Sequence, residues 1–174
     1  TTNSDNKNPR PLIRHLVRHY HTSPIENSHI DLEVSLPIFV ERQWARHRTA
    51  GWNEVSARYC ELPAEQWEIP DRRYQYEPPE GANRQGSWGL LDPLRRRFLK
   101  GKLKRFLNSA VQQYKLFRSE KLAPEISRIV LPLSTYTRKR WWVDMHNMMN
   151  FLRLRQAPDA QAEIREYANA ISEL

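Results

Sequence analysis

The sequence has few of the residues on which several large classes of protein depend. Its single cysteine, Cys60, excludes an internal disulfide and any zinc or iron–sulfur site built from several cysteines. No apolar run approaches the roughly 20 residues of a membrane span, and the polar residues 1–8 do not resemble a secretory signal. With five glycines, the chain contains neither the dinucleotide-binding fingerprint nor the phosphate-binding loop. We therefore expect a cytoplasmic protein whose side chains, rather than a glycine-rich turn, bind any phosphate.

The charge of the chain is uneven and mostly due to arginine. The net charge is +8, from 28 basic and 20 acidic residues, and 21 of the basic residues are arginines. Residues 84–105 hold eight basic residues and one acidic residue, so most of the excess lies there. Because arginine binds phosphates and carboxylates bidentately, the composition predicts an anionic partner: a nucleotide, an RNA or an acidic protein.

The order of the periodic segments predicts one α+β domain over residues 11–174, preceded by a flexible tail over residues 1–10. Apolar residues at helical spacing predict helices over residues 11–20, 37–44, 93–114 and 124–130, one capped by Asp144, and a last one from Pro158. Alternating apolar and polar residues predict a strand over 29–35, and a segment rich in β-branched and aromatic residues predicts another over 135–143. Residues 46–63 are predicted to be a loop that runs into an extended segment, and residues 68–91 a long loop. This order predicts a small antiparallel sheet flanked by helices.

The helix after Asp92 and Pro93 combines apolar and basic residues. Its spacing predicts that one face is buried through Leu99, Leu103, Phe106, Leu107, Ala110 and Tyr114. The basic run is then on the opposite face. Such a face is usually solvated, and a functional alternative is that it binds an anionic tail such as folate polyglutamate.

The densest polar stretch lies between residues 46 and 59. It places three arginines, His47, Glu54 and Ser56 within thirteen residues. Such a cluster can neutralise one or two phosphates and hydrogen-bond a polar ring. A solvated charged loop is the alternative interpretation.

Arg-His-Arg at residues 46–48, followed after seven residues by Ser-Ala-Arg at 56–58, resembles the signature of the flavin-dependent thymidylate synthases. Residues 21–26, His-Thr-Ser-Pro-Ile-Glu, resemble that family's His-x-Thr/Ser-Pro-x-Glu turn. Other stretches agree in order and spacing, namely residues 37–43, 128–132, 150–155 and 160–164. The resemblance extends from about Leu12 to the end, apart from residues 65–123.

The resemblance implies a homotetramer with active sites shared between subunits. It implies methylation of C5 of a uracil nucleotide, UMP or dUMP, with FAD, NADPH and 5,10-methylenetetrahydrofolate. The nucleotide ligands would be Gln43, Arg46, Glu54, Ser56, Ala57, Arg58, Arg128 and Arg155. The FAD contacts would be Ser23, Glu26, Arg46, His47, Arg48, Glu54, Asp144, His146 and Asn150. The catalytic residues would be Arg155, which polarises the uracil ring, Ser56, and His21 at the folate face.

The chain departs from the family pattern in three places. Residues 1–10 are polar where the family has a strand and a helix, and the family's C-terminal extension is absent after Leu174. Asp144 and His146 stand where many members have Asn and Arg. We therefore expect a smaller sheet and a specialised pathway. In this respect the chain is similar to members of polyoxin-type nucleoside antibiotic clusters, which accept UMP as well as dUMP.

Two further interpretations are a non-enzymatic RNA- or DNA-binding protein, suggested by a pI of 9.9, and an inactive scaffold. Glu26 and Glu54 among the arginines argue against nucleic acid, because carboxylates repel a phosphate backbone. We expect no metal site, since His15 and His19 share a helix face without a supporting carboxylate. Cys60 precedes Glu61, whose charge disfavours a thiolate, so we expect no cysteine nucleophile.

Overall fold

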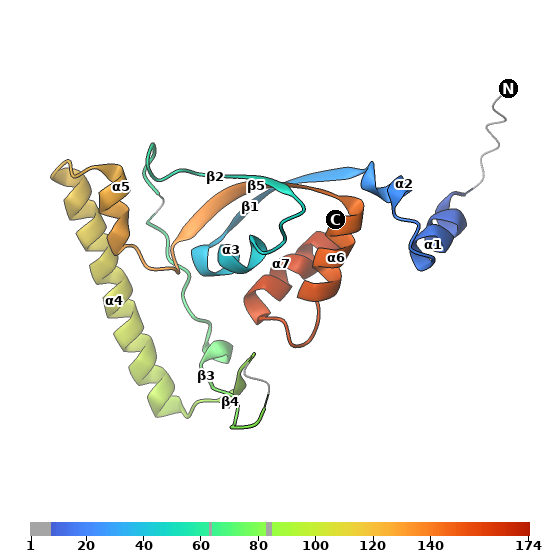
Figure 1. The fold of residues 1–174 in the computed structure, drawn as a ribbon. Coiled ribbons are helices and arrows are strands. Elements are labelled where there is room, and N and C mark those ends of the chain that lie inside the picture. Colours follow the sequence, from blue (N-terminus) through green and yellow to red (C-terminus); the bar gives the residue numbers. More distant parts are fainter. Residues whose placement is uncertain (1–7, 63, 83–84) are drawn as a thin grey trace.

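The computed structural model describes residues 8–62, 64–82 and 85–174 (Figure 1). The first half contains α1 (Arg10–Arg18), α2 (Ser23–Glu26), β1 (His29–Pro37), α3 (Ile38–Trp44), β2 (Gly51–Glu54), the 3-10 helix η1 (Asp71–Arg73) and β3 (Gln75–Tyr76). The second half contains β4 (Trp88–Leu90), α4 (Pro93–Ser119), α5 (Pro124–Ser127), the 3-10 helix η2 (Arg128–Val130), β5 (Tyr136–Asp144), α6 (Met145–Arg155) and α7 (Ala162–Ser172). Most of the predicted flexible tail, residues 1–7, lies outside the described residues, and α1 begins at Arg10.

The main sheet has three antiparallel strands in the order β1-β5-β2. β5 lies in the centre, with Pro37 opposite Tyr136 on one side and Glu54 opposite Lys139 on the other. This arrangement confirms the predicted small antiparallel sheet. Residues 46–63 contain the short strand β2, where a loop that runs into an extended segment was predicted. The interpretation of residues 68–91 as a loop was wrong at two short places, because β3 and β4 pair there. Strands of two to four residues are too short to show a period.

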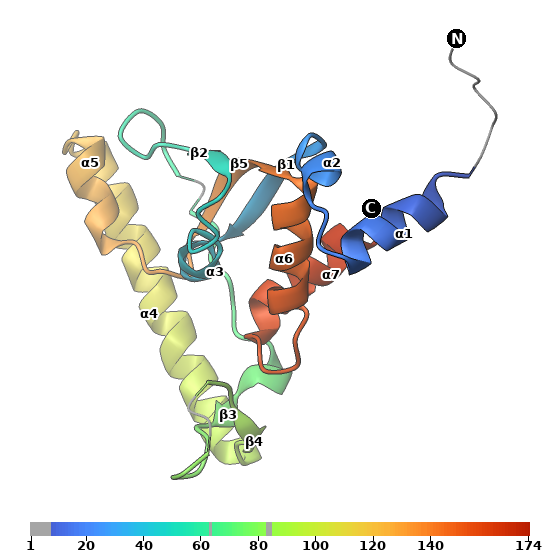
Figure 2. The same ribbon diagram turned by 45° about the vertical axis from the view of Figure 1, so that its right-hand side comes forward.

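Helices α3, α6 and α7 cover one face of this sheet, as both views show (Figures 1 and 2). The inner face of β5 is buried at alternate residues, which follows from the period of two in a strand. The core between sheet and helices is formed by Leu36, Val40, Trp44, Trp141, Val143, Met148, Phe151, Ile164 and Ala168. The side chain of Asp144 accepts a hydrogen bond from the Asn147 backbone N–H at 2.9 Å, which confirms the predicted cap of α6.

Helix α4 extends away from the sheet and packs against α5 and η2 at its C-terminal part (Figure 1). Asp92 caps it by accepting from the Arg95 N–H at 3.0 Å. The predicted buried face was partly wrong, because Leu99 is 42% exposed and Phe106 58% exposed. Leu107, Ala110 and Tyr114 are buried, as predicted. Apolar residues lie on two faces of α4, and only one of them meets the rest of the chain.

Two findings concern the classes excluded above. Within the described ranges, no helix is long and apolar enough to cross a membrane. The same residues contain no group of three or more His, Cys, Asp or Glu side chains arranged to hold a metal ion. The rings of His15 and His19 stack on each other, with centroids 4.4 Å apart.

Candidate active site

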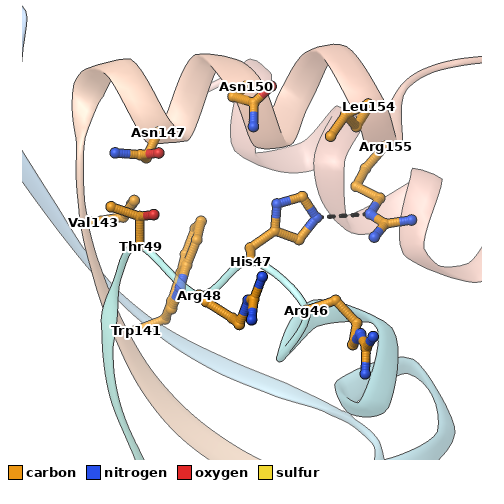
Figure 3. Close-up of a pocket in the computed structure, with 10 residues that line it drawn as sticks. All are labelled: Arg46, His47, Arg48, Thr49, Trp141, Val143, Asn147, Asn150, Leu154 and Arg155. Atoms are coloured by element: carbon orange, nitrogen blue, oxygen red, sulfur yellow. Dashed lines mark hydrogen bonds between the residues drawn. The ribbon is translucent and has the colours of Figure 1, made fainter.

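A cleft of about 280 Å³ lies between α6 and the segment that follows α3 (Figure 3). We call it the arginine cleft. It is lined by Arg46, His47, Arg48, Thr49, Trp141, Val143, Asn147, Asn150, Leu154 and Arg155, a set without any acidic residue. Arg46 and Arg48 form no ion pair with another described residue. The cleft therefore suits an anionic ligand with groups that amides can hydrogen-bond.

Arg155 is held in this cleft by His47 and by the backbone of α3. Its Nε donates to Nε2 of His47 at 2.9 Å (Figure 3). Its Nη2 donates to the Gln43 carbonyl at 3.4 Å. Because Nε2 accepts, the neutral His47 ring carries its proton on Nδ1. Burial, followed by the charges of Arg155 and Lys139, lowers the pKa of His47 to about 4. At neutral pH His47 is therefore an uncharged acceptor that fixes the direction of the guanidinium.

This arrangement predicts an acid-sensitive stability. The pKa of His47 is about 4 in the folded protein, against its ordinary value of 6.5 in an unfolded chain, so the unfolded chain binds more protons between these values. The free energy of unfolding is expected to fall as the pH drops through that window. The His47→Gln variant, which has no titrating ring, should lose less stability between pH 7 and 4.5 in urea unfolding experiments. His19→Gln, at an exposed position, should keep the wild-type dependence, and an equal dependence in all three proteins would contradict the prediction.

A second cleft, of about 540 Å³, lies on another face of α3 and reaches β2. We call it the α3–β2 cleft. It is lined by Ile38, Glu41, Arg42, Ala45, Trp52, Glu54, Val55, Ser56, Ala57, Leu62, Arg128, Leu131 and Thr137. Glu54 is oriented by Thr137, whose hydroxyl donates to it at 2.7 Å. The cleft thus combines two arginines, two carboxylates and a serine at the rim of the sheet.

The structure divides the predicted nucleotide ligands between the two clefts. Glu54, Ser56, Ala57 and Arg128 line the α3–β2 cleft, whereas Arg46 and Arg155 line the arginine cleft. Gln43 adjoins Arg155 through its carbonyl and hydrogen-bonds Gln161 through its side chain. Arg58 lies outside both linings and forms an ion pair with Glu125, with Nε and Oε2 3.1 Å apart. Within one protomer, the predicted nucleotide ligands therefore form two separate groups, one at each cleft.

The predicted FAD contacts are also only partly gathered. His47, Arg48 and Asn150 join Arg46 in the arginine cleft, while Glu54 is on the other side of α3. The remaining FAD contacts lie around α2 and the start of α6, outside both linings, and are Ser23, Glu26, Asp144 and His146. His21, predicted at the folate face, lies just before α2 and is also outside both linings. Burial raises the pKa of the Asp144 carboxyl, but the hydrogen bonds that it accepts from Asn147 lower this pKa by more, so the pKa lies below its usual value.

Some lining residues were missed by the sequence analysis. In the arginine cleft these include Asn147 and Leu154, which share a helix face with Asn150 at spacings of three and four residues. In the α3–β2 cleft they include Glu41 and Arg42, which share a face with Ile38 and Ala45. The helical spacing was visible in the sequence. What it could not show was which face of each helix borders a cleft.

Comparison with known proteins decides the family. The model of the thymidylate synthase complementing protein family matches residues 1–174. The chain belongs to this family. It is 44% identical over 163 residues to the flavin-dependent thymidylate synthase of Thermus thermophilus, covering 94% of this chain and 58% of that protein. It is 43% identical over 166 residues to that of Dictyostelium discoideum, covering 92% and 52%. The chain thus spans somewhat more than half the length of these relatives.

A solved structure shares the fold of this family member. The UMP/dUMP methylase PolB from Streptomyces cacaoi, bound with 5-Br UMP, superposes with a TM-score of 0.83 and 32% identity. The match covers 94% of this chain and 76% of PolB. The same methylase bound with 5-Br dUMP gives a TM-score of 0.81 and 33% identity. These comparisons confirm the predicted fold class and the resemblance to flavin-dependent thymidylate synthases.

Proposed function

We propose that the chain methylates C5 of a uracil mononucleotide, UMP or dUMP, as an FAD- and NADPH-dependent enzyme that uses 5,10-methylenetetrahydrofolate. The observation that carries this proposal is the Arg155 guanidinium, fixed by a neutral His47 in a cleft whose lining has no acidic residue. The relatives named flavin-dependent thymidylate synthase and the similarity to a UMP/dUMP methylase support it.

Arg155 is the residue that we assign to the uracil ring. C5 of neutral uracil is a weak nucleophile. It becomes a stronger one when the ring takes on enolate character, with negative charge shared between C5 and the oxygen on C4. A guanidinium that is already oriented stabilises this charge without having to reorganise. Burial lowers the pKa of Arg155, yet the pKa of an arginine starts so far above neutral pH that the guanidinium keeps its charge.

The arginine cleft fits the anionic part of a flavin dinucleotide. Arg46 and Arg48 offer two cations without carboxylate partners among the described residues, and Asn150 offers an amide. When bound, FAD reduced by NADPH supplies the hydride, and methylenetetrahydrofolate supplies the carbon. We propose that Arg46 and Arg48 bind phosphate, and that Asn150 and the Nδ1–H of His47 hydrogen-bond the ring. Ser23, Glu26, Asp144 and His146 are proposed as further FAD contacts, and His21 as the contact at the folate face.

The division of the nucleotide ligands supports a shared active site. A mononucleotide in the α3–β2 cleft meets Ser56, Glu54 and Arg128, and Arg58 lies beside them. Arg46 and Arg155 of the same protomer lie in the arginine cleft instead, and the Gln43 carbonyl accepts from Arg155 there. We therefore propose that a second copy of the chain supplies this second group. A homotetramer with active sites between subunits would accomplish this.

The proposal is tested by tritium release from 5-tritiated UMP and dUMP, in parallel, with FAD, NADPH and methylenetetrahydrofolate. Release that requires all three supports the proposed reaction, and the ratio between the two nucleotides gives the preferred substrate. Absence of release from both nucleotides, while the protein binds FAD, would instead favour the scaffold interpretation.

The basic segment gives less support to a nucleic-acid binder than its composition suggests. Lys100 forms an ion pair with Asp71 at 2.8 Å, and Arg95 forms one with Asp92 at 3.3 Å. Arg84 lies outside the described residues. Within α4, the basic residues of the segment 84–105 belong to its N-terminal half, which lies beside β3 and β4 (Figures 1 and 2). Binding of a folate polyglutamate tail to this segment stays a prediction.

Cys60 is expected to be dispensable for the reaction. Its thiol is exposed and donates to the Ser56 carbonyl at 3.2 Å, and it is absent from the linings of both clefts. The Cys60→Ser variant keeps a donor at the same place, so tritium release should remain within about twofold of wild type. A folded Cys60→Ser protein without activity would show instead that the thiol takes part.

A further inference from the structure

Lys139 is a buried cation that lines neither the arginine cleft nor the α3–β2 cleft. It lies on the inner face of β5 and is 1% exposed. Its Nζ is 3.4 Å from Oε1 of Glu41, on α3. Glu54 on β2 is its direct partner across the strands, and such partners on one face of a sheet have neighbouring side chains. The ammonium is also 5.1 Å from the ring centroid of Trp44 and 5.7 Å from that of Trp52.

The surroundings of Lys139 join it to the wall of the α3–β2 cleft. Glu41, Trp52 and Glu54, three of the four side chains just named, line that cleft. On the other side, β1 presents the apolar Val34 opposite Lys139. An ammonium removed from water needs compensating charge, and here two carboxylates and two aromatic faces provide it.

The electrostatics agree with this arrangement. Burial lowers the pKa of Lys139, and the charges of Glu41 and Glu54 act in the opposite direction without reversing the shift. The titratable groups that face it are two carboxylates, Glu41 from α3 and Glu54 from β2, and, at longer range, the neutral His47 from the segment after α3. Arg42 and Arg128 line the same cleft but carry the same sign of charge as Lys139.

We infer that Lys139 is a positioning residue for the nucleotide: from behind the wall of the α3–β2 cleft, it holds Glu54 and Glu41 in place as carboxylates. This inference rests on the proposed function. Glu54 is then fixed from two sides, by the Thr137 hydroxyl and by the ammonium. A carboxylate held this way accepts hydrogen bonds from the hydroxyl or imide groups of a nucleotide. Without the cation, Glu54 is free to turn towards the phosphate and repel it.

The test is a double-mutant cycle read by calorimetric titration with UMP and with dUMP. Four proteins are compared: wild type, Glu54→Gln, Lys139→Met with Glu41→Gln, and all three substitutions together. Replacing Lys139 and Glu41 together avoids leaving one buried charge without a partner. We expect affinity to fall about tenfold when the pair is replaced in the wild-type background. In the Glu54→Gln background the same replacement should change affinity less than twofold.

Several outcomes decide the matter. Equal losses in both backgrounds, or no loss in either, overturn the positioning role, because a purely structural effect does not depend on Glu54. Lys115→Met, which removes an exposed lysine of α4, is the matched control and should bind as wild type does.

If the neutral pair does not fold, Lys139→Arg provides the second test. It keeps the buried cation, so affinity should stay within threefold, and a tenfold loss with a native circular dichroism spectrum overturns the inference. Absence of UMP and dUMP binding by the wild type overturns the proposed function itself and this role with it.

Discussion

Replacing Arg155 by lysine is expected to lower tritium release from 5-tritiated UMP or dUMP by about a hundredfold to a thousandfold. The guanidinium makes two contacts at once, through Nε to His47 and through Nη2 to the Gln43 carbonyl. A lysine has one nitrogen on a flexible stem, so it cannot keep both contacts and still present a planar charged face to the ring. The loss should lie mainly in kcat, because the interaction strengthens as charge develops in the transition state.

The matched control for this experiment is Arg138→Lys. Arg138 is an exposed arginine of β5 that lies 3.6 Å from Glu33, on the sheet face turned away from α3 and α6. Its replacement should leave tritium release unchanged. If Arg155→Lys retained most of the wild-type kcat while binding FAD normally, Arg155 would not be the group that polarises the ring. The charge stabilisation would then have to come from Arg46 or Arg48.

The long elements of the fold could be predicted from the sequence because each repeats a period often enough. β1 and β5 have nine residues each, and side-chain burial alternates along all of β5 and along β1 as far as Leu36. β2 has only four residues, Gly-Trp-Asn-Glu, which is too few to show an alternation of apolar and polar residues. Its place in the sheet is determined by pairing with β5. For α4 the period was visible but ambiguous, since Leu99 and Phe106 are as apolar as Leu107. Only the position of the neighbouring α5 and η2 decides which face is buried.

In the candidate site too, the local motif could be predicted from the sequence, whereas contacts between distant residues could not. The motif over residues 46–58 was recognisable as a linear pattern. Its first half follows α3 directly and borders the arginine cleft, whereas its second half follows β2 and borders the α3–β2 cleft. β2, an edge strand of the sheet, lies between the two halves of the motif, so residues that are close in sequence reach different clefts. The contact between His47 and Arg155 joins residues 108 positions apart, and nothing in local spacing indicates it.

Phe151→Ala is expected to have the largest effect on stability, lowering the free energy of unfolding by about 3–5 kcal/mol. Phe151 is fully buried and links the core to the arginine cleft. Its ring centroid is 4.7 Å from that of Trp44, 5.2 Å from that of Trp141 and 4.9 Å from that of His47. Removing the ring leaves a cavity between rigid indoles that cannot collapse into it. It also removes the surface against which His47 packs, so Arg155 should lose its fixed direction.

Urea unfolding followed by circular dichroism measures this change, at one protomer concentration for all proteins because association adds to apparent stability. Phe98→Ala is the matched control, since Phe98 is 62% exposed on α4, and its replacement should change the free energy by less than about 0.5 kcal/mol. A loss below about 1 kcal/mol for Phe151→Ala would mean that the indoles repack around the gap. Tritium release at a temperature where the variant stays folded then separates the two roles. If Phe151 supports only the core, the kcat of the folded Phe151→Ala protein equals that of wild type. If Phe151 also orients His47, the kcat of Phe151→Ala is lowered, as it is in Arg155→Lys.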